Sequence, residues 1–134
     1  MIFLNFFNGQ LTIPLTVEKI GNSAFRNCCG LTGSLVLPAN VNFTYIEFRA
    51  FYNCSSFHGS LVVPENVVSI EFSAFNGCSG FNGSLSLPSM LESLKEDAFN
   101  GCSGFVGTSI IPQFVKEISK SCFLSTNFSK VVSN

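Results

Sequence analysis

The stretch Phe81-Asn-Gly-Ser-Leu-Ser-Leu-Pro-Ser-Met-Leu-Glu-Ser-Leu-Lys-Glu-Asp-Ala-Phe-Asn-Gly-Cys-Ser-Gly104 decides the fold, because close copies of it fill the chain. Its proline recurs every 24 or 26 residues, as Pro14, Pro38, Pro64, Pro88 and Pro112. Its phenylalanine keeps the same intervals, as Phe25, Phe51, Phe75, Phe99 and Phe123. A repeat of roughly 20 to 29 residues with apolar side chains at fixed places predicts a solenoid, in which each repeat forms one coil.

The repeats divide the chain into five coils, 7–30, 31–56, 57–80, 81–104 and 105–128, with incomplete flanking repeats at 1–6 and 129–134. The second coil is two residues longer, and we place the insertion between Val41 and Ile46, so that Asn42 to Tyr45 should form an outward loop. One coil buries too little apolar surface to be stable alone, so the coils must stack. Terminal coils without polar caps should fray or associate end to end with another copy.

Within each coil, alternating apolar residues predict a short strand whose first and third side chains point inward, as in Leu35-Val-Leu37 and Leu85-Ser-Leu87. Proline ends this strand because it has no N–H for a ladder hydrogen bond. A second extended segment follows, and then an Ala-Phe pair leads through a turn into the next coil. The inward positions of the second segment are expected to be Val17 and Ile20, Val41 and Ile46, Val67 and Ile70, Leu91 and Leu94, and Val115 and Ile118.

Composition excludes several classes of function. Charged residues make up only 11% of the 134 residues and the net charge is -1, which argues against binding of nucleic acid or an anionic membrane. The apolar runs are too short to span a bilayer, which requires roughly 20 residues. The start, Met1 to Asn8, is apolar but has no basic region or cleavage site, so it is a poor signal peptide. It resembles the tail of a preceding coil, as if the chain were an excerpt from a longer array.

Catalytic and cofactor sites are not expected. His58 is the only histidine, beside Gly59 at a coil corner, and no Ser or Cys nucleophile with an orienting third group can be assigned to it. The carboxylates recur at the repeat period rather than as a convergent pair. We therefore expect no enzyme activity, no cofactor and no metal.

The cysteines form a ladder at the repeat period, as Cys28, Cys54, Cys78 and Cys102, with Cys29 and Cys122 as extras. Stacked coils lie about 4.8 Å apart, which would permit disulfides. Cysteine also serves as a small buried hydrophobe in a turn, and we favour buried free thiols over disulfides. Sequons at Asn42, Asn53, Asn82 and Asn127 match the glycosylation pattern, although Asn and Ser are also ordinary turn residues.

The candidate binding surface is the outward side of the first strand of each coil. Its central residues are Thr12, Val36, Val62, Ser86 and Ile110, accompanied by Ser34, Ser60 and Ser84. This stripe is uncharged and mildly apolar, and solenoids bind protein partners on such extended surfaces. The alternative is that these side chains are simply good strand formers.

The repeats resemble the BspA-like subfamily of leucine-rich repeat proteins. Val17-Glu-Lys-Ile-Gly-Asn-Ser-Ala-Phe-Arg-Asn-Cys28 and Val67-Val-Ser-Ile-Glu-Phe-Ser-Ala-Phe-Asn-Gly-Cys78 carry the resemblance, which extends over about 7–128. The departures are the insertion and, in the last coil, Ser109 for the first Leu of the strand, Cys122 for Ala and Thr126 for Cys.

This resemblance implies a right-handed leucine-rich-repeat solenoid with short parallel strands on its concave face, and with short second strands, turns and 3-10 segments elsewhere. It also implies a non-enzymatic protein-binding module of a cell-surface or secreted adhesin, whose ligand would be a host matrix or plasma protein such as fibronectin or fibrinogen. The alternative function is an intracellular scaffold that uses the same surface for a cytosolic protein partner. Either way, we expect a protein ligand and no insertion into a membrane.

Overall fold

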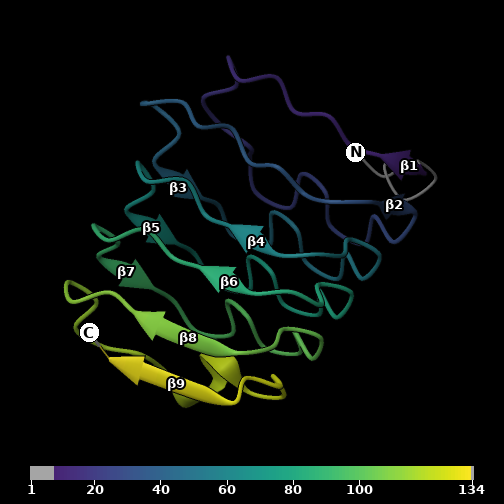
Figure 1. The fold of residues 1–134 in the computed structure, drawn as a ribbon. Helices are drawn as coiled ribbons and strands as arrows, with labels where there is room; N and C mark the ends of the chain where they lie inside the picture. Colours follow the sequence, from purple (N-terminus) through teal and green to yellow (C-terminus); the bar gives the residue numbers. More distant parts are fainter. Residues whose placement is uncertain (1–7, 134) are drawn as a thin grey trace.

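Parallel strands stacked coil upon coil form a β-solenoid of about five turns with almost no helix (Figure 1). The computed structural model describes residues 8–133, so Phe7 and the predicted flanking segment 1–6 lie outside the described residues. Along the chain the elements are β1 (Gly9–Gln10), β2 (Leu31–Thr32), β3 (Tyr45–Ile46), β4 (Leu61–Val62), β5 (Ser69–Ile70), β6 (Leu85–Ser86), β7 (Ser93–Leu94), β8 (Thr108–Ile111), the 3-10 helix η2 (Lys120–Phe123) and β9 (Lys130–Ser133). The predicted solenoid of leucine-rich-repeat type is confirmed.

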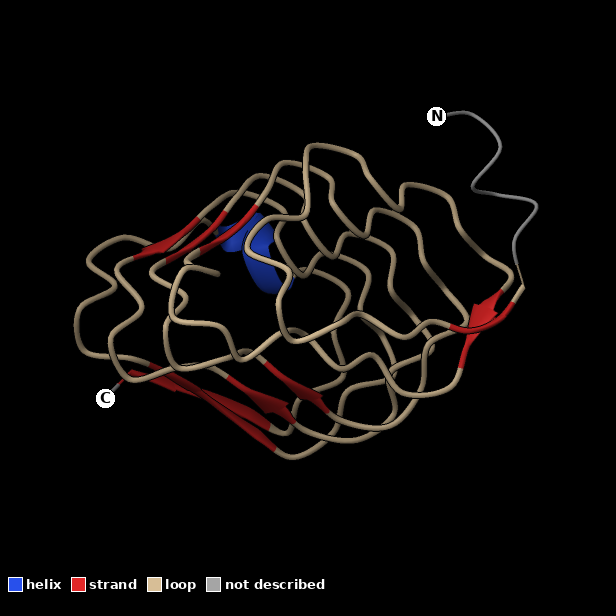
Figure 2. Ribbon diagram, turned by 90° about the horizontal axis from the view of Figure 1, so that it is seen from above, coloured by secondary structure: helices blue, strands red, loops and turns tan. Residues whose placement is uncertain are grey.

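The strands form parallel ladders between successive coils. β3, β5 and β7 make one sheet in that order, while β1 pairs with β2, β4 with β6, and β8 with β9. Seen from above, the β3–β5–β7 sheet and the group of β4, β6, β8 and β9 lie on opposite sides of the coil (Figure 2). The third and fourth coils therefore each contribute one strand to either layer, and the core lies between the layers.

Two columns of residues with positive φ form the turn that connects the layers. One column precedes the Ala-Phe pair, and it consists of Ser23, Arg49, Ser73 and Asp97. The other lies two residues after the Phe, and it consists of Asn27, Asn53, Gly77, Gly101 and Ser125. A left-handed conformation costs a residue other than glycine about 1–2 kcal/mol, so stacking of the coils must offset this cost.

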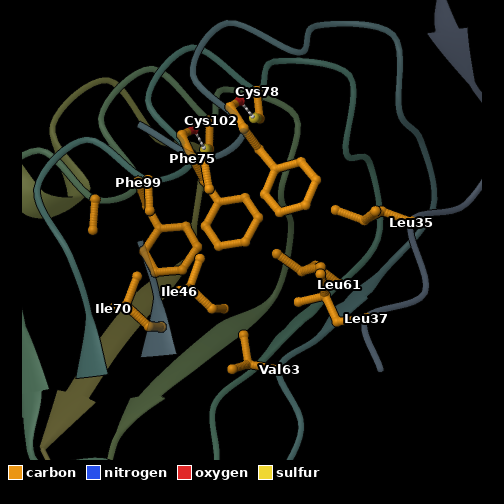
Figure 3. Close-up of a cluster of buried hydrophobic side chains, with 14 of the residues drawn as sticks. Leu35, Leu37, Ile46, Leu61, Val63, Ile70, Phe75, Cys78, Phe99 and Cys102 are labelled. Carbon is orange, nitrogen blue, oxygen red and sulfur yellow. Dashed lines mark hydrogen bonds between the residues drawn. The ribbon is translucent and has the colours of Figure 1, made fainter. Parts of the chain in front are cut away.

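Two ladders of phenylalanine fill the core between the layers. The first ladder is Phe25, Phe51, Phe75, Phe99 and Phe123, whose neighbouring rings are stacked with centroids 5.3–5.7 Å apart. The second ladder is Phe57, Phe81, Phe105 and Phe128, which also stack on one another. Phe57, Phe105 and Phe128 meet rings of the first ladder edge to face. Aliphatic side chains of both strand layers close around the first ladder (Figure 3). Stacked ring pairs contribute about 0.5–1.5 kcal/mol each beyond the area that they bury.

The two-residue insertion lies closer to Pro38 than the sequence suggested. Phe43 is fully buried, whereas Val41 is 73% exposed. The Phe43 amide donates to the Asn40 carbonyl at 2.9 Å, in the three-residue turn that the other coils make from their proline. The predicted outward loop from Asn42 to Tyr45 is therefore wrong. Placing Phe43 in the core buries more apolar surface than placing Val41 there would. This arrangement also keeps β3 in register with β5.

Ile118 is a second departure, because it was expected inward but is 42% exposed. The β3–β5–β7 sheet ends at β7, so within the described residues no strand of the fifth coil extends it. In place of that strand, Ser119 caps η2 by accepting a hydrogen bond from the Ser121 amide. The chain next to Ile118 thus turns into a 3-10 helix rather than into the ladder.

Candidate binding surface

The predicted stripe lies on one side of the coil, beside the strands β4, β6 and β8. Val36, Val62 and Ile110 are 66%, 63% and 55% exposed, while the residues on either side of each in the sequence are buried. Thr12, Ser86, Ser34, Ser60 and Ser84 are exposed as well. Strand alternation explains this arrangement, because successive side chains point to opposite faces.

The register between the coils brings members of the stripe together. Val62 lies directly opposite Ser86 in the β4–β6 pair. The Ser84 amide donates to the Ser60 hydroxyl at 2.9 Å, and the two hydroxyl oxygens are 3.2 Å apart. In the second coil the segment from Leu35 to Leu37 keeps the alternation of burial without forming a strand, and the strand of that region, β2, lies four residues earlier. Ser60 and Ser84 are therefore hydrogen-bonded to each other, whereas Val36 and Val62 remain exposed.

Two shallow grooves run along the stripe. One has a volume of about 280 Å³ and is lined by Val36, Val62, Ala39 and Pro64, among others. The other, of about 320 Å³, lies farther along the stack and is lined in part by Ser86, Ile110 and Glu65. The first groove is mainly apolar, whereas the second also contains hydroxyl groups and the carboxylate of Glu65. Shallow grooves of this kind suit extended contact with a protein surface. They lack the enclosed shape of a site for a small substrate.

A cluster of aromatic and cationic side chains lies elsewhere, in the turn that follows β3. The guanidinium of Arg49 lies over the rings of Phe48 and Tyr52, and Arg26 of the preceding coil lies over the same Tyr52 ring. Sequence reasoning missed this cluster, because it gave neither arginine a role. The two arginines are 23 residues apart, and only the stacking of coils brings them to one ring.

The cysteines lie where the ladder predicts. Cys28, Cys54, Cys78, Cys102 and Cys122 are buried, Cys29 is exposed, and all six are free thiols. The thiols of Cys54, Cys78 and Cys102 donate to phenylalanine carbonyls of the preceding coil over 2.9–3.1 Å, and Figure 3 shows two of these bonds. Burial raises the pKa of Cys54 and of Cys122 to about 12. These thiols are therefore neutral and serve the fold.

His58 is exposed, and its backbone amide donates to the Gly33 carbonyl at 2.9 Å. Its position fits the corner role that the sequence suggested. Across residues 8–133, no group of three or more His, Cys, Asp or Glu side chains is placed to hold a metal ion. No helix in the described part of the chain is long and apolar enough to cross a membrane.

Comparison with known proteins finds one match, to a protein family. The family model of the BspA type leucine rich repeat region matches residues 2–128 in six copies. No curated protein and no solved structure matches the chain. The matched span covers nearly all of the sequence, including every coil that carries the stripe. The division into five repeats with our boundaries stays a prediction.

Proposed function

This chain belongs to the BspA-type leucine-rich repeat family, and from that premise we propose that it is a non-enzymatic module that binds a protein ligand through the stripe. The observation that carries the proposal is the row of Val36, Val62 and Ile110, which are more than half exposed on one side of the solenoid. Leaving such side chains in water forgoes roughly 1.5–3 kcal/mol each, and a partner would recover part of this by covering them.

The proposed setting is the cell surface or the extracellular space, where the module would belong to an adhesin for a matrix or plasma protein. The family resemblance supports this setting. The structural support is that the stripe residues themselves carry no charge, which favours recognition by shape and apolar contact over electrostatic steering.

An intracellular scaffold for a cytosolic protein is the second candidate, and the free thiols favour it. Five buried cysteines stacked along one solenoid remain unpaired, which is usual in a reducing compartment and uncommon in secreted proteins. The same stripe would then bind a cytosolic protein.

Capture of purified partners tests the proposal and separates the two settings. The wild type would be immobilised and exposed to fibronectin, fibrinogen and other plasma proteins, and in parallel to cytosolic extract. The test variant carries Val36→Lys, Val62→Lys and Ile110→Lys. A control carries Val41→Lys, Met90→Lys and Val106→Lys, which adds the same charge at exposed apolar positions outside the stripe.

We expect the wild type and the control to capture a ligand and the stripe variant to lose it, with unchanged circular dichroism in all three. An extracellular ligand would support the adhesin, and a cytosolic ligand would support the scaffold. Equal capture by the stripe variant would contradict the proposed surface.

A further inference from the structure

The cluster of Arg26, Phe48, Arg49 and Tyr52, here called the arginine–tyrosine cluster, is brought together by the stacking of two coils. The Arg49 Cζ atom lies 4.9 Å from the Phe48 ring centroid and 5.2 Å from that of Tyr52. The Arg26 Cζ atom lies 5.5 Å from the same Tyr52 centroid. Beneath the cluster, the Asn27 amide donates to the Tyr52 carbonyl at 2.7 Å, which fixes the two coils against each other.

The charge of this cluster is not balanced within the described structure. Arg26 and Arg49 are the only arginines of the chain, and a guanidinium stays protonated in proteins. Among residues 8–133 neither guanidinium forms an ion pair, and the Arg49 Nε atom is buried without a hydrogen-bond partner.

Two cations on one ring repel each other, and a cation–π contact at an exposed site is weak. Guanidinium groups bind carboxylates through paired N–H donors, and such charge-assisted bonds are stronger than neutral ones. A carboxylate placed between Arg26 and Arg49 would relieve the repulsion. The ring contacts have already ordered both side chains, so binding would cost little further entropy.

The surroundings of the cluster decide which anion fits. The Phe48 ring, 39% exposed, contacts the Arg49 guanidinium. Phe72, 46% exposed, follows one coil later, and its carbonyl accepts a hydrogen bond from the Arg49 amide. Tyrosine and arginine, together with tryptophan, are enriched at the energetic centres of protein interfaces. A polyanion such as nucleic acid would require many more cations than this chain of net charge -1 provides.

We propose that the arginine–tyrosine cluster binds an acidic peptide segment, in which carboxylates alternate with aliphatic side chains. The carboxylates bridge Arg26 and Arg49, and the aliphatic groups lie on Phe48 and its neighbouring rings. This surface shares no residue with the stripe, so it gives the module a second point of contact with protein.

Tyrosine fluorescence is a local probe for this site. The chain has two tyrosines, Tyr45 and Tyr52, and no tryptophan. The titrant is a twelve-residue peptide of alternating Glu and Leu, which has no aromatic ring of its own. We expect a saturable change in tyrosine emission that weakens as salt is raised, because the contact is ionic at an exposed surface. The matching Lys–Leu peptide should give no saturable change.

Arg26→Gln is the decisive variant, because Arg26 is exposed and its loss leaves the core intact. We expect it to weaken binding of the Glu–Leu peptide at least tenfold. Lys130→Gln removes the same charge at the far end of the stack, in β9, and should leave the affinity unchanged within twofold. Equal binding by Arg26→Gln and the wild type, no response to the Glu–Leu peptide, or an equal response to inorganic phosphate would each overturn the proposal.

Discussion

Ser109 replaces the leucine that the other coils place at the start of the strand, and it offers a sharp test of the packing. Its side chain is fully buried, and its hydroxyl has no hydrogen-bond partner. A buried hydroxyl without a partner costs about 1–3 kcal/mol. Ser109→Ala removes that cost and leaves a void of roughly 15 Å³, which costs about 0.4 kcal/mol.

We therefore expect Ser109→Ala to stabilise the protein by about 1 kcal/mol, which raises the melting temperature by roughly 3–5 °C in a chain of this length. Urea unfolding followed by circular dichroism measures the free energy, and a thermal scan gives the melting temperature. Ser86→Ala, one coil earlier and exposed, is the matched control and should stay within about 0.5 kcal/mol of the wild type. A loss of stability in Ser109→Ala would refute the reasoning, because it would mean that the hydroxyl has a partner worth more than its burial costs.

Three further predictions test the stack. Gly104→Ala should lower the free energy of unfolding, measured in urea, by at least about 3 kcal/mol, because a Cβ atom there meets the carbonyl oxygens of Phe81 and, at 2.7 Å, Ser79. In the control Gly21→Ala the added Cβ meets nothing within 4 Å, so the free energy of unfolding should change by less than about 1 kcal/mol. Phe43→Ala should lower the free energy of unfolding by about 3–5 kcal/mol, and Val41→Ala by less than about 0.5 kcal/mol. A larger loss in Val41→Ala than in Phe43→Ala would support the placement of the insertion first predicted from the sequence. The pKa of Cys54, raised by burial from 9.0 to about 12, implies stability that is present below pH 9 and falls as pH rises from 9 to 12, because the unfolded thiol then loses its proton first. Unfolding from pH 8 to 11 should show a shallower decline in Cys54→Ala than in the wild type, and equal slopes would contradict the assignment.

Most of the fold follows from the sequence because a solenoid gives equivalent residues equivalent surroundings. Phe75 and Phe99 occupy the same place in successive coils and stack at 5.3 Å, so their spacing in the sequence translates directly into a contact. The same logic predicted the burial of Cys54 and Cys78 and the exposure of Val62. Each position of the repeat occurs in several coils, so its burial is predicted from several residues rather than from one.

Where one coil differs from the others, the repeat no longer predicts which side chains are buried. The insertion offered two ways to continue the ladder, one with Val41 inward and one with Phe43 inward, and both kept Ile46 in place. The larger apolar area of Phe43 and the turn from Asn40 decided between them. The prediction that Ile118 points inward was wrong for a related reason. The fifth coil adds no strand to the β3–β5–β7 sheet, so no ladder directs this side chain into the core.

By itself, the sequence determined the period, the solenoid, the core ladders and the outward stripe, because these depend on spacing that repeats along the chain. Only the tertiary structure brought Arg26 and Arg49 to the ring of Tyr52, and only it left the hydroxyl of Ser109 without a partner. Both features occur once and arise between coils. Their energies depend on the register and rotamers of neighbouring coils, which no repeated pattern in the sequence records.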